Sequence, residues 1–118
     1  MAAYESALFE PPAPVAYVTL RNSVSGATWT DAPMLLDTGA DVTLIPRAAL
    51  EKLGLTLIPD LSYELAGYDG RTNYADVVQL ELVFCRRTFR GQFLLVDQPW
   101  GIIGRNVLNA VALLFHGP

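Results

Sequence analysis

Apolar and polar residues alternate over much of the chain, which is the pattern of β-strands that bury one face. The longest example is residues 72–84, whose second half has apolar side chains at every other position: Val78, Leu80, Leu82 and Phe84. The residues between them, Gln79 and Glu81, are predicted to face water. Shorter apolar or β-branched runs predict further strands at residues 15–21, 32–36, 42–45, 62–66, 89–96, 102–103 and 111–115.

Proline and glycine mark where strands give way to turns and helices. Pro46 precedes residues 47–53 and Gly54 follows them, which predicts a short helix with the usual proline start and glycine end. Residues 105–110 are predicted to form one or two more helical turns. Asp69-Gly70 joins two predicted strands and indicates a β-hairpin. Together, these elements predict a mostly-β fold, with a closed or nearly closed sheet and one or two short helices.

Length and composition are those of one compact domain. The chain has 118 residues, of which 52% are hydrophobic, enough to fill a core. Residues 1–14 contain three prolines and are expected to form an extended, poorly ordered N-terminal arm, followed by the domain at residues 15–118. A domain of this size leaves a large fraction of its surface exposed to solvent, so pairing with a second copy would bury more of that surface.

Charge and the rare residue types argue against several classes of function. Twelve acidic residues against eight basic ones give a net charge of -4, so no nucleic-acid partner is expected. Cys85 and His116 are the only residues of their kinds, so the sequence predicts no disulfide, no metal site and no other cofactor. No signal peptide is recognisable, and no apolar stretch approaches the length of about 18 residues that spans a membrane. The protein is therefore predicted to be cytoplasmic, with no membrane partner.

One motif carries recognisable chemistry. The segment Leu35-Leu36-Asp37-Thr38-Gly39-Ala40-Asp41 places a carboxylate at the end of an apolar strand, followed by a hydroxyl, a glycine and a small residue. Taken alone, the Asp-Thr-Gly tripeptide favours an ordinary turn that Asp37 caps with its own side chain. Strand-like residues on both sides, however, bring this carboxylate close to a core. A second segment, Ile102-Ile103-Gly104-Arg105-Asn106, follows after a hairpin, and this order of motifs is far more specific than the tripeptide.

In this order, the motifs resemble those of the retropepsins, the retroviral-type aspartic proteases, and of their cellular and bacterial relatives. The resemblance extends over residues 15–115 and is strongest at residues 36–43 and 102–108. Residues 43–55 look more like the cellular and bacterial branch. The resemblance implies a retropepsin-like closed β-barrel fold that is active as a symmetric homodimer. The function it implies is that of an aspartic endopeptidase, with a peptide or protein as substrate.

The resemblance also implies that Asp37, Thr38 and Gly39 are catalytic. In this family two aspartates bind one water; one acts as a general base, and the other, protonated, donates to the peptide carbonyl. Two like charges in contact do not both ionise, so the pair shares a proton and titrates as one unit. Because this chain has a single Asp-Thr-Gly, the second Asp37 is expected from another copy across a twofold axis.

Further roles follow from the resemblance position by position. Substrate-binding residues are expected at Ala40, Asp41, Gly67, Tyr68, Asp69, Gly70, Trp100 and Ile102. The turn at residues 67–71 would act as a flap over the substrate, and Asp41 would form a structural pair with Arg105. Each role has an alternative. The turn is otherwise an ordinary hairpin, the Asp41–Arg105 pair an ordinary surface ion pair, and Trp100 a core residue.

Two further alternatives stay open at this point. The last predicted strand, residues 111–115, either lies inside one subunit or, as the resemblance suggests, joins a sheet between subunits. The turn at residues 67–71 has fewer glycines than the viral pattern, and its residues Tyr68 and Asp69 are bulky. The alternative function is therefore a retropepsin-like dimerisation or peptide-binding module with little or no proteolytic activity, which would hold peptides by strand addition. The intact Asp37-Thr38-Gly39 favours the peptidase.

Overall fold

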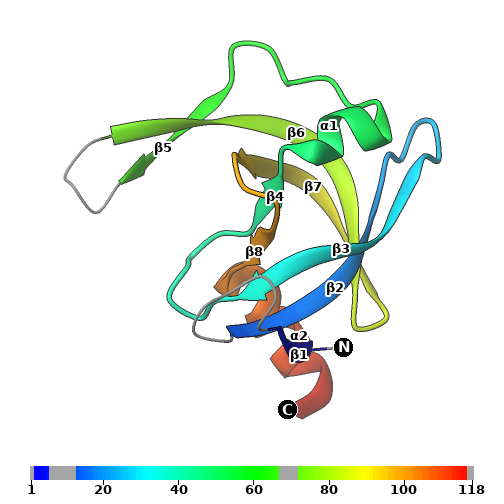
Figure 1. Ribbon diagram of the computed structural model, residues 1–118, viewed down its shortest axis with the longest axis vertical. Coiled ribbons are helices and arrows are strands. Elements are labelled where there is room, and N and C mark those ends of the chain that lie inside the picture. The colour runs from blue at the N-terminus through cyan, green and yellow to red at the C-terminus, as the bar shows by residue number, and fades with distance from the viewer. Residues whose placement is uncertain (1, 6–12, 67–71, 117–118) are drawn as a thin grey trace.

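The computed structural model describes residues 2–5, 13–66 and 72–116 (Figure 1). Its elements, in chain order, are β1 (Ala2–Glu5), β2 (Ala13–Arg21), β3 (Thr28–Leu36), β4 (Leu44–Pro46), α1 (Ala48–Leu53), β5 (Ser62–Ala66), β6 (Thr72–Phe84), β7 (Arg87–Val96), β8 (Gly101–Ile103) and α2 (Arg105–His116). Strands make up most of this part of the chain, so the prediction of a mostly-β fold is confirmed.

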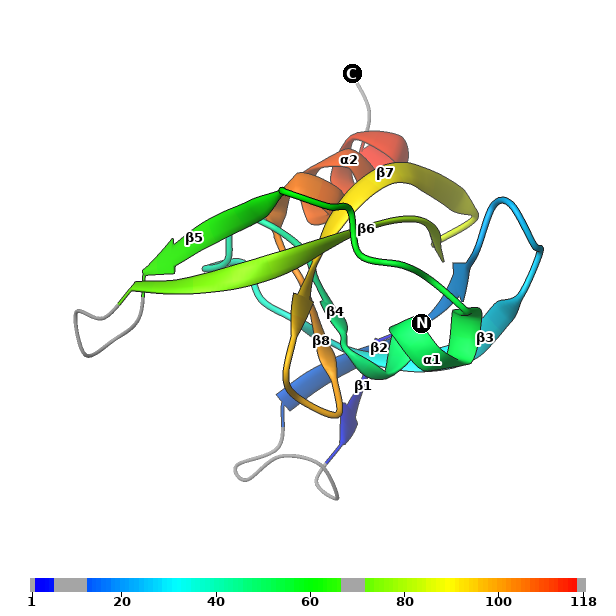
Figure 2. The same cartoon turned by 90° about the horizontal axis from the view of Figure 1, so that it is seen from above.

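The strands close into a barrel. They pair in the order β2, β3, β8, β4, β7 and β6, and β6 pairs again with β2, which completes the ring. The neighbours β3–β8 and β4–β7 are parallel. β1 adds to the outside of β2, and β5 pairs with the first part of β6, so that the β5–β6 hairpin reaches out beyond the barrel (Figures 1 and 2). The predicted closed β-barrel is therefore confirmed.

Apolar faces of the strands fill the barrel. In β6, the alternation predicted from the sequence is confirmed, because Gln79 is exposed and the apolar residues on the other face are buried. Helix α1 buries Ala49 and Leu53 against the same core and ends at Gly54, whose φ of 62° lies in the left-handed region that favours glycine. The largest fully buried side chains include Leu20, Met34, Ile45, Leu53, Leu80, Leu82 and Ile103.

The prediction that Glu81 faces water is wrong. This residue is 5% exposed, because β6 lies between β2 and β7 at this point and each neighbouring strand places an arginine opposite it. Arg21 Nε lies 2.7 Å from Glu81 Oε1, and Arg90 Nε lies 2.5 Å from Glu81 Oε2. Two guanidinium partners compensate the burial of the carboxylate. The ion pairs therefore join three strands where the barrel closes.

Glu81→Gln is expected to lower the melting temperature at neutral pH and to make it less sensitive to acid. The hydrogen bond from Arg21 is the main reason why the pKa of Glu81 lies below its ordinary value of 4.5 in the folded chain. A carboxyl group with a lowered pKa stabilises the fold above its unfolded-state pKa, and this contribution is lost as the pH falls through the folded value. Thermal unfolding at neutral pH and in mild acid measures the effect. An equal loss of stability on acidification in both proteins would contradict this assignment.

The C-terminal end differs from prediction. Helix α2 runs over Arg105–His116, so residues 111–115 are helical and do not form the predicted last strand. Val107 is buried, and Leu108 and Val111 pack partly buried against the same core. These positions follow a helical spacing, and a short apolar run does not by itself distinguish a helix from a strand. A final strand, whether inside one subunit or in a sheet between subunits, is therefore not formed by residues 111–115.

The N-terminal end also differs. Ala2–Glu5 forms β1, which pairs antiparallel with the start of β2, so these residues are not the poorly ordered arm that was expected. β2 begins at Ala13, two residues before the predicted strand. Residues 6–12 lie outside the described part of the chain. The division into residues 1–14 and 15–118 stays a prediction.

Candidate active site

Asp37 lies where β3 and β8 end side by side. The strands pair Leu36 with Ile103, and the Asp37 N–H donates to the Ile103 carbonyl oxygen at 3.1 Å. The chain then turns: the Gly39 N–H donates to Asp37 Oδ1 at 2.8 Å, and the Ala40 N–H donates to the Asp37 carbonyl oxygen at 3.2 Å. Asp37 therefore does cap its own turn, as the simpler interpretation predicted. A carboxylate has lone pairs left after accepting one N–H, so this role is compatible with binding a water.

The residues that follow Asp37 are braced by the segment that begins α2. We call residues 37–43 the Asp37 loop. The Gly104 N–H donates to Thr43 Oγ1 at 3.0 Å, and the Thr43 hydroxyl donates to Asn106 Oδ1 at 2.8 Å. The Arg105 N–H donates to the Ala40 carbonyl oxygen at 2.8 Å. Because Thr43 is 2% exposed, its hydroxyl needs partners inside the protein. The two motifs that are far apart in the sequence thus form one hydrogen-bonded unit.

Gly104 leaves no space for a side chain. A Cβ atom at this position would lie 2.3 Å from the Val42 carbonyl oxygen and 2.9 Å from the Ala40 carbonyl oxygen. Both are backbone atoms of the Asp37 loop, so neither moves without displacing that loop. Glycine is therefore needed here for the close approach of the two segments.

Asp37 lines an open cleft of about 830 Å³. The Asp37 loop and β4 form one part of it, Tyr74 and Ala75 of β6 a second, and the end of β7 with Asp97 and Gln98 a third. Ile102 of β8 also contributes to the lining. The cleft thus combines the half-buried Asp37 with apolar residues and with the charged side chains of Asp41, Arg47 and Asp97.

Residues 20–107 match the protein family described as aspartyl protease. The chain belongs to the aspartyl protease family. Among solved structures, it is similar to the EIAV protease, which was solved in complex with the inhibitor HBY-793. The TM-score is 0.62 at 22% sequence identity, over 85% of this chain and 88% of that chain. This likeness establishes the fold and confirms the retropepsin-type fold that the sequence motifs implied.

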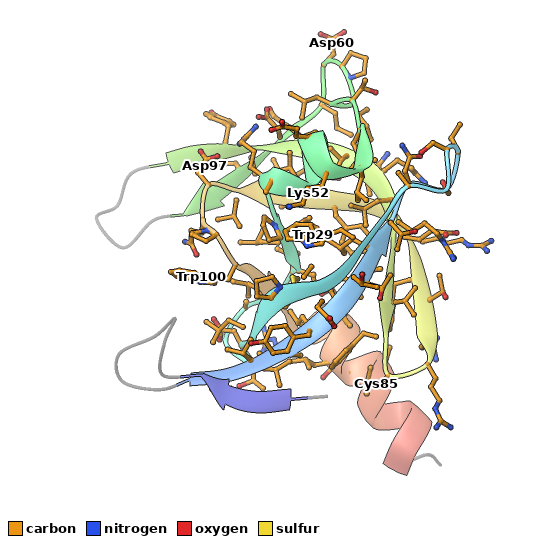
Figure 3. The ribbon with its side chains drawn as sticks, turned by 45° about the vertical axis from the view of Figure 1, so that its right-hand side comes forward. Trp29, Lys52, Asp60, Cys85, Asp97 and Trp100 are labelled. Carbon is orange, nitrogen blue, oxygen red and sulfur yellow. The ribbon has the colours of Figure 1, made fainter. Side chains whose placement is uncertain are left out.

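Several residues expected at the candidate site lie together, because Asp37, Gly39, Ala40, Asp41 and Ile102 all line the cleft. Thr38 is in the same turn and is exposed. Trp100 is half-buried on the loop between β7 and β8, beside the cleft-lining part of that loop and not itself in the lining (Figure 3). Gly67, Tyr68, Asp69 and Gly70 lie outside the described residues. The catalytic and substrate-binding roles of all these residues stay predictions.

Asp41 and Arg105 form an ion pair between Asp41 Oδ1 and Arg105 Nη2. Their side chains are 77% and 51% exposed, so in water the pair contributes little to stability. It joins the Asp37 loop to the start of α2, beside the hydrogen bond from the Arg105 N–H to the same loop. That Asp41 receives the backbone of a substrate stays a prediction.

A charged group at the cleft was not predicted from the sequence. Arg47, at the start of α1, has Nη2 2.9 Å from Asp76 Oδ2, and its Nε contacts Asp97 Oδ1. The hydrogen bonds to Asp76 and then to Asp97 raise the pKa of Arg47 above its ordinary value, so the guanidinium stays charged. The buried Thr43 and its partner Asn106 were also missed. The available signals were a threonine inside an apolar run and, for Asn106, its place in the second motif.

Within residues 2–5, 13–66 and 72–116, no group of three or more His, Cys, Asp or Glu side chains is arranged to hold a metal ion. In the same part of the chain, neither helix has the length and apolar character needed to cross a membrane.

Proposed function

We propose that this protein is an aspartic endopeptidase that acts as a homodimer, with one Asp37 from each chain. The observation that carries the proposal is the place of Asp37, on a braced turn that opens to a cleft, in a chain of the aspartyl protease family. Hydrolysis of this kind needs two carboxylates in different protonation states, and each chain carries a single Asp-Thr-Gly. A twofold axis next to Asp37 would bring the same residue of a second copy alongside it.

The proposed reaction uses the two carboxyl groups and one water. The ionised Asp37 takes a proton from the water, and the water oxygen attacks the peptide carbonyl carbon. At the same time the protonated Asp37 of the partner subunit donates its proton to the carbonyl oxygen. The tetrahedral species then loses a hydroxyl proton to one carboxylate, and the nitrogen receives a proton from the other carboxyl group as the C–N bond breaks. The products are an acid and an amine, and the pair ends with the single proton with which it began.

Residues around Asp37 suit supporting roles in this proposal. Gly39 has no side chain where a substrate backbone would approach, and Ala40 is small for the same reason. Thr38, exposed beside Asp37, would hold the corresponding turn of the partner subunit through its hydroxyl. Asp41 and Ile102 line the cleft and would receive the backbone and a side chain of the substrate.

Wild-type protein is expected to cleave an unstructured protein substrate in an assay between about pH 4 and pH 7. A transition-state-mimicking inhibitor of aspartic proteases should block this cleavage. Asp37→Asn should reduce the rate by at least about a thousandfold, because both chains of the pair then lack the carboxyl group that acts on the water and the peptide. The measurement is the appearance of fragments over time, with both proteins at equal concentration.

Equal cleavage by the wild type and Asp37→Asn would reject the proposal, because the activity would then arise elsewhere. If neither protein cleaved and both bound peptides tightly, the chain would instead be a retropepsin-like peptide-binding module. Sedimentation of the wild type gives a separate test, since a strict monomer that cleaves peptides would contradict the shared pair.

A further inference from the structure

We propose that Arg47 is a positioning residue that holds two walls of the cleft, the β5–β6 hairpin and the loop after β7, at a fixed separation. It thereby sets the affinity for the substrate and the selectivity for its side chains. The inference rests on the proposed endopeptidase function. It is based on the two carboxylates that Arg47 contacts, Asp76 and Asp97, and on where these lie in the fold.

The backbone of Arg47 is fixed to the barrel. Its N–H donates to the Val96 carbonyl oxygen at 3.0 Å, which extends the parallel pairing of β4 with β7 by one residue. The residue also stands at the start of α1, where its side chain makes no capping hydrogen bond. The guanidinium is therefore free of a helix-capping role and extends from a rigid base.

Asp76 marks the point at which β6 leaves the barrel. It is the last residue of β6 that pairs with β5, opposite Ser62, and the next residue, Val77, is the first that pairs with β7, opposite Leu94. The residues before it, Tyr74 and Ala75, line the cleft. An ion pair at Asp76 therefore acts on the root of the β5–β6 hairpin, the wall of the cleft that extends beyond the barrel (Figure 2).

Asp97 occupies a comparable position in a second wall, at the end of the neighbouring strand β7. It is the first residue after β7, at the start of the loop that leads to β8, and it lines the cleft together with Gln98. Its side chain is 79% exposed, and its Oδ1 contacts Arg47 Nε. Figure 3 shows Asp97 at the end of β7, with Trp100 further along the same loop. Arg47 thus contacts Asp76 and Asp97, the residues at which the two walls leave the barrel.

The chemistry of arginine suits this arrangement. The guanidinium is planar and rigid, and its Nε and Nη2 donors point in fixed directions, so two carboxylates bound to it are held in a fixed relation. Ion pairs that are this exposed stabilise a fold only slightly. Loss of Arg47 should consequently change the geometry of the cleft far more than the stability of the barrel.

Arg47→Met is expected to raise KM for a cleaved peptide by about tenfold or more while kcat changes less than about threefold, because substrate binding is lost without loss of the acting groups. Selectivity between peptides that differ in one side chain next to the cut should fall at the same time. Arg47→Lys, whose ammonium pairs with one carboxylate at a time, should restore part of the affinity. A residue with a merely structural role would alter the melting temperature without splitting KM from kcat.

A measurement without catalysis completes the test. Hydrogen exchange should accelerate in Arg47→Met within residues 62–66, 72–76 and 97–101 and stay unchanged in β2. Arg90→Gln is the matched control, because it removes an arginine–carboxylate contact on β7 away from the cleft and should leave KM and both walls unchanged. Unchanged exchange in both walls, or an unchanged KM, would overturn the role of Arg47. Absence of cleavage by the wild type would instead reject the proposed function, and the exchange data would still decide whether Arg47 holds the walls.

Discussion

Replacing Gly104 by alanine is expected to reduce proteolysis strongly and to lower stability, because the added methyl group meets backbone atoms of the Asp37 loop. The Cβ atom would lie 2.3 Å from the Val42 carbonyl oxygen and 2.6 Å from its carbonyl carbon, far inside contact distance. Neither atom can rotate away, so the loop or the start of α2 must move. The Gly104 N–H also donates to Thr43 Oγ1, and a shift of the glycine would weaken that bond.

The size of both effects follows from the geometry. Overpacking a tight contact typically costs about 1–3 kcal/mol of unfolding free energy, and the backbone partners here put Gly104→Ala at the upper end. Activity should fall further, by about a hundredfold or more, since displacement of a catalytic group by about 1 Å is already that costly. Peptide cleavage rates and denaturant unfolding of the same preparation measure the two effects.

Gly54→Ala is the control for a general loss of stability. Gly54 has a φ of 62° and nothing within 4 Å of an added Cβ atom, so alanine there strains the backbone at the end of α1 and displaces no neighbour. It should lower stability by roughly 1–2 kcal/mol, the cost of the left-handed conformation for a residue with a Cβ atom, and leave the cleavage rate of folded protein unchanged. If Gly104→Ala reduced activity no more than Gly54→Ala does, the close contact would have no role in holding Asp37.

The centre of the candidate site was predicted from two local motifs, residues 35–41 and 102–106, and from the family that their order resembles. The motif around Asp37 is a strand end followed by a tight turn, and each of its features is visible within seven consecutive residues. The barrel was predictable for a similar reason, since the alternation in β6 depends on neighbours two positions apart. At Asp37, the interpretation as a turn cap and the interpretation as a site residue are compatible, because the same carboxylate caps its turn and lines the cleft.

Features that depend on strand pairing were not predictable. Glu81 continues the polar alternation of β6, and only the closure of β6 against β2 brings Arg21 opposite it. Arg47 likewise meets Asp76 and Asp97 because three separate elements converge at one end of the cleft. Charged partners from distant segments leave no periodic signal in one sequence. Helix α2 was missed for another reason, since a short apolar run is compatible with both helix and strand until its packing is known.

Mixing wild-type chains with Asp37→Asn chains is expected to inhibit cleavage more strongly than dilution does. If each active site needs one Asp37 from each of two copies and the chains exchange freely, the fraction of intact pairs is the square of the wild-type fraction. An equal mixture should then retain about one quarter of the activity of wild type at the same total concentration, whereas independent chains would retain about one half.

A mixed pair should contribute little to this activity. Its single Asp37 can still take a proton from water when ionised, but the amide of asparagine has no acidic proton to pass to the carbonyl oxygen or the departing nitrogen. Activity is therefore measured across a series of mixing ratios at constant total chain, after co-purification of a tagged copy has shown that subunits exchange. A quadratic dependence on the wild-type fraction supports the shared pair. A linear dependence with exchange established would mean that one chain hydrolyses peptides with Asp37 alone, a result that a two-carboxylate mechanism does not accommodate.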